Sequence, residues 1–137
     1  MAKYRLEERV APAVDVFGIS CHVPDYRLCW SLNKSLGLDL TRRRDDIVQE
    51  VNGRALHYPV FDQVDEEGVM RWSLVSNACG RRHLVPQQKQ SDYFLLVDHE
   101  TAVRDPVLME RLRGAEFVLT AYPIEMGTLK MGHKLLL

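Results

Sequence analysis

Two runs of arginine are the residues of this sequence with the clearest chemistry. Three consecutive arginines precede two aspartates in TRRRDD, and a second pair stands in CGRRH. Guanidinium groups form bidentate hydrogen bonds with carboxylates and phosphates, so both runs suit an anion or an acidic protein surface. If the fold joins the runs they form one cationic patch, although Asp45 and Asp46 could neutralise the first. The residues proposed for this patch are Arg42, Arg43, Arg44, Arg81 and Arg82.

Four other polar residues border apolar segments and suggest an alternative site: Asp25, Asn33, Asp92 and Tyr93. An enzyme or a small-molecule sensor would need at least three of them to converge on one concave pocket. Asn33 falls on the apolar side of an expected helix, where an amide must be hydrogen-bonded. A bond from Asn33 to neighbouring backbone is favoured over a ligand contact.

Known catalytic and metal-binding motifs are absent from the sequence. It has no phosphate-binding glycine loop, no GxSxG and no HExxH, and Cys21, Cys29 and Cys79 form no CxxC pair. Cys79 with His83, together with Cys21 beside His22, comes nearest to metal-ligand spacing. Cys79, just ahead of the second arginine pair, is the only arguable nucleophile. We therefore expect no metal and no cofactor, and we favour a non-enzymatic role.

The composition is that of an ordinary globular protein. With 137 residues, 46% apolar and 27% charged, the chain fits one domain over residues 1–137. A formal net charge of −1 argues against a dedicated nucleic-acid binder, so an RNA-binding accessory role is the weakest alternative. The first ten residues lack the apolar core of a signal peptide, and no apolar run approaches the roughly 20 residues that span a bilayer. We expect a cytoplasmic protein without a membrane partner.

The periodicity of apolar residues predicts the element order ββαββββαβ. The expected strands cover 3–10, 13–21, 45–51, 55–63, 69–78, 92–99 and 116–124, and the expected helices 24–37 and 105–114. The strands around VDEEG should form a hairpin with an acidic tip, and Pro59 should place its strand at an edge or a bulge. We expect an α+β domain with a mixed, largely antiparallel sheet of about six strands and two helices on one face, of which a ferredoxin-like core with extra strands is one version.

The helix over 24–37 has clear boundary signals. Asp25 should cap its first turn, and Gly37 should end it. The expected buried arc holds Tyr26, Leu28, Cys29, Trp30, Leu32 and Leu36. The expected outer arc holds Arg27, Ser31, Lys34 and Ser35.

Other boundary signals lie elsewhere in the chain. The second helix should have Asp105 at its N-cap and Pro106 at its first position, and Gly114 should follow its end. Gly18 marks a bulge or a close backbone approach in the first buried strand. The C-terminal segment EMGTLKMGHKLLL could dock on the core or offer a partner an apolar anchor, and docking is favoured.

Two segments together resemble the uncharacterised bacterial family named for its IPExxxVDY motif. In the window VPQQKQSDY, Pro86, Asp92 and Tyr93 match the motif, Val85 replaces its isoleucine, and Gln87 and Ser91 depart from it. The first helix resembles a second recurrent segment of that family. The residues that carry this second likeness are Tyr26, Leu28, Trp30, Asn33 and Lys34.

The resemblance implies no catalytic residue, because the family has no assigned activity. Gln87 cannot act as a general acid or a metal ligand, so the motif is expected to be structural here. Gene neighbourhoods of the family imply acyl carrier protein, which is small and acidic, as a partner. We therefore expect an interaction or regulatory domain that binds an acidic protein linked to fatty-acid synthesis, and an exposed edge strand could also support a homodimer.

Overall fold

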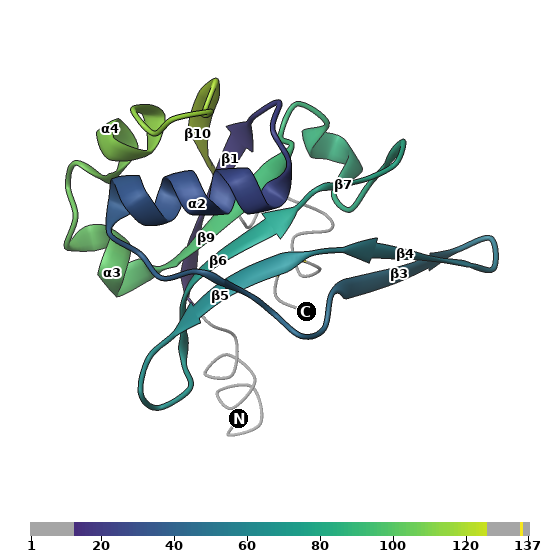
Figure 1. Ribbon diagram of the computed structural model, residues 1–137, viewed down its shortest axis with the longest axis horizontal. Coiled ribbons are helices and arrows are strands. Elements are labelled where there is room, and N and C mark those ends of the chain that lie inside the picture. Colours follow the sequence, from purple (N-terminus) through teal and green to yellow (C-terminus); the bar gives the residue numbers. More distant parts are fainter. Residues whose placement is uncertain (1–12, 126–134, 136–137) are drawn as a thin grey trace, which may run out of the picture.

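Six strands of the computed structural model form one sheet in the order β10-β1-β9-β6-β5-β2 (Figure 1). The structure describes residues 13–125 and residue 135. The strands are β1 (Val14–Ser20), β2 (Thr41–Arg42), β5 (Val60–Val64), β6 (Met70–Ser76), β9 (Tyr93–Asp98) and β10 (Thr120–Ile124). All pairings among these strands are antiparallel, so the α+β class is confirmed without the parallel pairs of a mixed sheet. The strand expected over 3–10 lies outside the described residues.

The centre of the sheet has the topology of a ferredoxin-like unit. In chain order it consists of β1, α2 (Asp25–Leu36), β6, β9, α4 (Leu108–Arg113) and β10. The spatial order β10-β1-β9-β6 places the first and third of these strands in the middle, as expected for a βαββαβ fold. Strands β5 and β2 extend this core beyond β6, which agrees with the expected core with extra strands.

One face of the sheet, the helical face, is covered by α2 and α4 (Figure 1). Alternate residues of β1 and β9 point to this side, because successive side chains of a strand face opposite ways. The apolar residues packed there include Phe17, Ile19, Leu95, Val97, Leu28, Leu32 and Leu112. Full burial of each such side chain contributes roughly 1.5–3 kcal/mol, so this layer is a main source of stability.

The opposite face, the hairpin face, is covered by two short ribbons and a loop. The ribbons are β3 (Ile47–Val51) with β4 (Arg54–Tyr58) and β7 (Ala78–Cys79) with β8 (Arg82–His83). The loop over 84–92 contains the 3-10 helix η1 (Pro86–Gln88). A second core lies beneath, built from residues that include Val16, Val60, Phe94, Leu96, Tyr58, Leu84 and Leu135. Leu135 alone represents the C-terminal segment, and the rest of that segment after Glu125 lies outside the described residues.

The predicted hairpin with an acidic tip is confirmed as β5 and β6. The single strand expected over 55–63 is wrong, because it divides at Pro59 into β4 and β5, which belong to different sheets. Proline has no N–H for a strand ladder, so the chain leaves one ribbon and enters the main sheet at this residue. The last strand begins at Thr120, later than expected.

The C-terminal stop of α2 is confirmed, whereas its expected cap is wrong. Gly37 has φ 66° and donates its N–H to the Asn33 carbonyl. Pro24 is the N-cap, and the Asp25 carboxylate accepts the N–H of Tyr26 at 2.7 Å. Asp25 is already inside the helix, one position too late to serve as its cap.

The buried stripe of α2 is narrower than the arc predicted from its periodicity. Leu28, Cys29, Leu32 and Leu36 are buried as expected. Tyr26 and Trp30 are 65% and 53% exposed, so their predicted burial is wrong. Ser31, expected outside, is buried and donates to the Glu116 carbonyl at 2.6 Å. Ser31 is buried because the segment that follows α4 packs against this side of α2 and excludes solvent from it.

The helix expected over 105–114 begins later than predicted, as α4. Val107 is the N-cap of α4, and the Leu108 N–H donates to the Asp105 carbonyl across a turn at 3.1 Å. The expected N-cap role of Asp105 is therefore wrong, and its carboxylate instead pairs with Arg111.

A short helix, α3 (His99–Val103), was not predicted. Asp98 caps it by accepting the N–H of Thr101 at 3.3 Å. Its five residues are too few for a helical apolar period to be visible. No helix of the described residues is long and apolar enough to cross a membrane.

Candidate anion-binding groove

Two tight turns on the hairpin face each place an arginine at the start of a returning strand. Asn52 and Gly53 have φ of 52° and 77°, the positive pair that a type I′ turn needs between β3 and β4. Gly80, with φ 60°, supplies the single positive φ of a type II′ turn between β7 and β8. Arg54 then pairs with Val51, and Arg82 pairs with Cys79. The turn chemistry thus fixes both arginines at the hairpin ends.

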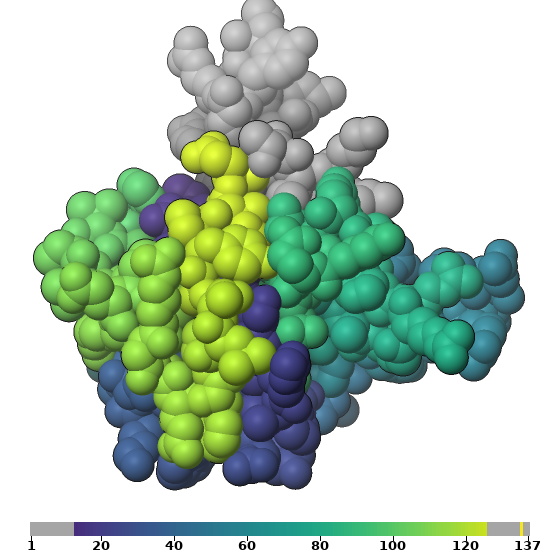
Figure 2. Space-filling view, turned by 90° about the horizontal axis from the view of Figure 1, so that it is seen from above, coloured from purple at the N-terminus to yellow at the C-terminus, as the bar shows by residue number. Residues whose placement is uncertain are grey.

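The two hairpin ends enclose a groove of about 460 Å³, here called the arginine groove. Its lining residues are Val51, Asn52, Arg54, Leu56, Cys79, Gly80, Arg81 and Arg82. Figure 2 shows the two hairpins projecting together from one side of the molecule. The lining has three guanidinium groups, an apolar part from Val51 and Leu56, and no carboxylate.

The three arginines of this groove have no ion-pair partner within the described part of the chain. The first arginine run differs. Arg42 bonds the Asp46 carboxylate at 2.9 Å, and Arg43 lies 3.7 Å from that of Asp62. Arg43 also donates to the Asp45 carbonyl at 2.8 Å, while Arg44 is exposed. Arginines with free hydrogen-bonding capacity are therefore concentrated in the groove.

The structure does not bring the two predicted arginine runs together. The first run precedes Ile47, at one end of β3, and the groove lies at the other end, beyond Val51. Four residue steps of strand separate these ends by roughly 13 Å. Arg81 and Arg82 instead meet Arg54, which the sequence interpretation did not select. The Asn-Gly turn before Arg54 was the available signal, since it places the next residue at a hairpin end.

A buried hydroxyl lies beneath the arginine groove. Tyr58 follows Arg54 and Leu56 on the same side of β4 and is fully buried. Its hydroxyl has no hydrogen-bond partner among the described residues. Burial raises the pKa of Tyr58; the nearby Cys79 thiol raises it further, and Arg82 lowers it. The hydroxyl is thus close to two groove residues and remains available as a donor.

The residues of the alternative pocket are only partly together. Asp92 and Tyr93 line an open hollow of about 690 Å³, which Asp25 and Asn33 do not line. Asp92 accepts the Cys21 N–H at 2.8 Å, and the Tyr93 hydroxyl donates to the Val23 carbonyl at 2.9 Å. Both side chains therefore already hold the connection between β1 and α2.

Asn33 is tied to neighbouring backbone, as expected. Its amide accepts the Leu40 N–H at 2.8 Å and donates to the Leu40 carbonyl at 3.1 Å. These two bonds fix the chain where it leaves α2 and use the polar atoms that a ligand would need.

The window resembling IPExxxVDY forms the loop that covers the hairpin face. The Val85 N–H donates to the Asn77 side chain at 2.8 Å, and the Asn77 amide donates to the carbonyls of Gln88 and Ser91. Val85 is buried, and Pro86 begins η1. Asn77, which the sequence interpretation missed, thus holds the window in place.

The helix that resembles the family's second segment carries an exposed aromatic cluster. Tyr26, Arg27, Trp30 and Phe117 line a hollow of about 360 Å³. The Arg27 guanidinium lies 4.6 Å from the Phe117 ring centre, and the Lys34 ammonium 5.1 Å from that of Trp30. Side-chain cations of the protein thus already cover the aromatic ring faces that a ligand would contact in this hollow.

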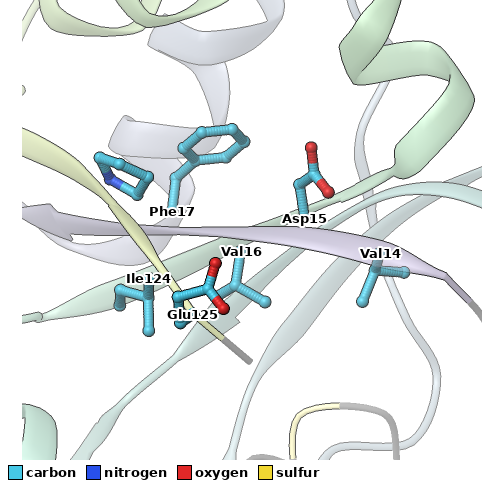
Figure 3. A pocket seen from close by; sticks show the side chains of 7 residues that line it. Val14, Asp15, Val16, Phe17, Ile124 and Glu125 are labelled. Atoms are coloured by element: carbon cyan, nitrogen blue, oxygen red, sulfur yellow. The ribbon is translucent and has the colours of Figure 1, made fainter. Parts of the chain in front are cut away.

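A further hollow of about 450 Å³ lies along β1 and the end of the edge strand β10. Figure 3 shows Asp15 and Phe17 on one side of β1 and Val14 and Val16 on the other. These side chains do not converge on a common centre, so the hollow does not define a binding site.

Comparisons of the chain with models of protein families, with curated proteins and with solved structures give no match. The resemblance to the IPExxxVDY family therefore stays a prediction. Within the described residues, no three His, Cys, Asp or Glu side chains are arranged to hold a metal ion. The arginine groove gathers three arginines that have no ion-pair partner among the described residues.

Proposed function

We propose that this protein is a non-enzymatic interaction domain whose arginine groove binds an acidic partner protein. The observation that carries this proposal is the convergence of Arg54, Arg81 and Arg82 on one hollow whose lining has no carboxylate. Side chains with unpaired charge must remain solvated or take a partner, and guanidinium groups match carboxylates and phosphates in shape and charge.

The composition of the groove suits a protein surface. Charge-assisted hydrogen bonds to three guanidinium groups supply orientation and fast association. Val51 and Leu56 add apolar area between them, against which an aliphatic part of the partner can pack. Carboxylates placed beside apolar side chains on one helix of a partner would satisfy both parts of the groove.

Acyl carrier protein is the first partner to test, because the family resemblance implies it and because it is small and acidic.

A homodimer through sheet edges has less support. The edge strand β2 has only two residues. On the other edge, Pro123 lacks an N–H, and the Ala121 carbonyl already accepts the Arg113 side chain at 3.0 Å. Both features are typical of edges that resist strand addition.

Two double variants with the same charge change test the proposal. Arg81→Glu/Arg82→Glu alters the groove, and Arg44→Glu/Arg104→Glu alters exposed arginines outside it. Titration calorimetry of full-length protein with acyl carrier protein should show at least about a tenfold loss of affinity for the groove variant, because each hydrogen bond to a charged group contributes roughly 1.5–3 kcal/mol. The control variant should stay within about twofold of wild type.

Equal losses in both variants would show that net charge, not the groove, drives binding. If wild-type protein does not bind acyl carrier protein, affinity capture from a lysate of the native cells with the same two variants tests other acidic partners. A partner retained by the control and lost by the groove variant supports the proposal, and capture unaffected by the groove variant overturns it.

A further inference from the structure

Cys79 is the cysteine that lines the arginine groove, and it differs from the other two thiols of the chain. It is half-buried, whereas Cys21 and Cys29 are 4% and 6% exposed. Burial raises the pKa of Cys21, and it raises that of Cys29 to about 11. Because the thiolate is the reacting form, these two thiols should react slowly and serve as internal references.

The surroundings of Cys79 are electropositive on more than one side. Arg82 stands directly opposite Cys79 in the β7–β8 pair, where paired Cβ atoms are about 4.5–5.5 Å apart. Arg54 and Arg81 line the same hollow. Positive charge close to a partly exposed thiol attracts anionic reagents to it.

The Tyr58 hydroxyl is a second, independent feature of this place. Tyr58 is fully buried, its ring packs in the same core that Cys79 contacts, and its hydroxyl has no partner among the described residues. Tyr58 does not itself line the groove, but its hydroxyl is close enough to Cys79 and Arg82, which do, to be affected by their charges. Cys79 thus lies close to a buried hydroxyl and lines the same hollow as three cations.

We propose that Cys79 is a thiol–disulfide exchange site for small disulfides that carry carboxylates. The Cys79 thiol releases its proton to solvent, and its sulfur attacks one sulfur of the disulfide. A bond forms between Cys79 and that sulfur, the original S–S bond breaks, and the second sulfur departs as a thiolate that takes up a proton. The disulfide is the only oxidant required.

The mixed disulfide places carboxylates beside Arg54, Arg81 and Arg82. These groups then occupy the guanidinium groups that the acidic partner would use, so exchange would block partner binding. This regulatory consequence rests on the proposed function, whereas the exchange at Cys79 does not.

The direct test compares two disulfide reagents on native full-length protein without any partner. The dianionic reagent is 5,5′-dithiobis(2-nitrobenzoate), and the uncharged one is 4,4′-dithiodipyridine. Each rate is divided by the rate of the same reagent with a small free thiol, and peptide mass spectrometry locates the first modified cysteine. We expect that residue to be Cys79, and the normalised preference for the anionic reagent to be about tenfold or more at low salt, falling as salt screens the charges.

Variants make the outcome decisive. Cys79→Ser should remove the fast phase and leave the slow reactions of Cys21 and Cys29. Arg81→Glu/Arg82→Glu should abolish the anionic preference, while Arg44→Glu/Arg104→Glu should retain it. The uncharged reagent reports whether a variant has merely changed the exposure of the thiol.

A first modification at Cys21 or Cys29, or an anionic preference that the groove variant leaves unchanged, overturns the inference. The two proposals fail separately. If neither the wild type nor any variant binds an acidic partner, but Cys79 still prefers the anionic reagent, only the proposed function is rejected. Partner binding without preferential exchange would reject only the Cys79 site.

Discussion

The helical face and the hairpin face of the sheet each bury an apolar core, the larger one beneath the helices, and cover these cores in different ways. On the helical face, α2 and α4 satisfy most of their own backbone, and apolar side chains make the contacts. On the hairpin face, short ribbons and a loop are held by side-chain bonds, with Asn77 at the centre. Tight turns there also present arginines that have no ion-pair partner among the described residues. The helical face also uses polar side chains such as Ser31 and Asn33 for its structure, but only the hairpin face gathers arginines without an ion-pair partner among the described residues in one hollow.

The largest difference in stability is expected between alanine variants of two asparagines, one that supports each face of the sheet. Asn77→Ala removes three side-chain bonds and leaves the Val85 N–H buried without a partner, which should cost about 3 kcal/mol. Asn33→Ala removes two bonds to Leu40 at a half-buried site and should cost about 1 kcal/mol. Urea unfolding of both variants measures the difference.

The same pair of variants separates an effect on overall stability from an effect on the arginine groove. If Asn77 supports the hairpin face specifically, Asn77→Ala should also weaken the anionic preference of Cys79 under conditions in which the protein remains folded. A larger loss of stability for Asn33→Ala than for Asn77→Ala would contradict the contrast between the faces.

The sequence predicts the helical face better than the hairpin face, and the reason is the length of the elements. Twelve residues of α2 show a helical period, and β9 shows a continuous apolar run. Strands β7 and β8 have two residues each and η1 has three, too few for any period. The breadth of an apolar arc is also ambiguous, which explains why Tyr26 and Trp30 were expected in the core.

The pairing state of an arginine is not visible in local sequence. Asp46 lies four residues after Arg42, and that partner could be anticipated. Asp62, which approaches Arg43, belongs to β5 and is brought there by the β2–β5 pairing. Arg54 joins Arg82 only because two separate hairpins meet. The groove is therefore a tertiary feature, although its turns are local ones.

Gly18 offers a second way to disturb the hairpin face. Its neighbours Phe17 and Ile19 point to the helical face, so Gly18 points to the other. A Cβ atom there would lie 2.5 Å from Ser91 Oγ and 2.7 Å from the Tyr122 ring, which confirms the predicted close approach. Gly18→Ala should cost about 2 kcal/mol through overpacking.

Gly37→Ala is the matched control for this substitution. Gly37 has φ 66°, and a Cβ atom added to it would have no neighbour within 4 Å, so only backbone strain of about 1 kcal/mol is expected. Thermal and urea unfolding of both variants would compare the cost of a steric clash at residue 18 with the cost of backbone strain at residue 37. Equal costs would mean that Ser91 and Tyr122 move aside freely and that the hairpin face is loosely packed.

The smallest effect, and the one of opposite sign, is expected from two tyrosine hydroxyls. Tyr93 on the helical face donates to the Val23 carbonyl at 2.9 Å, so Tyr93→Phe should lose about 1 kcal/mol of stability. Tyr58 on the hairpin face has no such partner among the described residues, so Tyr58→Phe should leave stability unchanged or raise it by up to about 1 kcal/mol. Unfolding measurements that show equal losses would mean that the Tyr58 hydroxyl is already satisfied and is no free donor beneath the groove. An unchanged or increased stability would instead show that folding gains nothing from this buried hydroxyl.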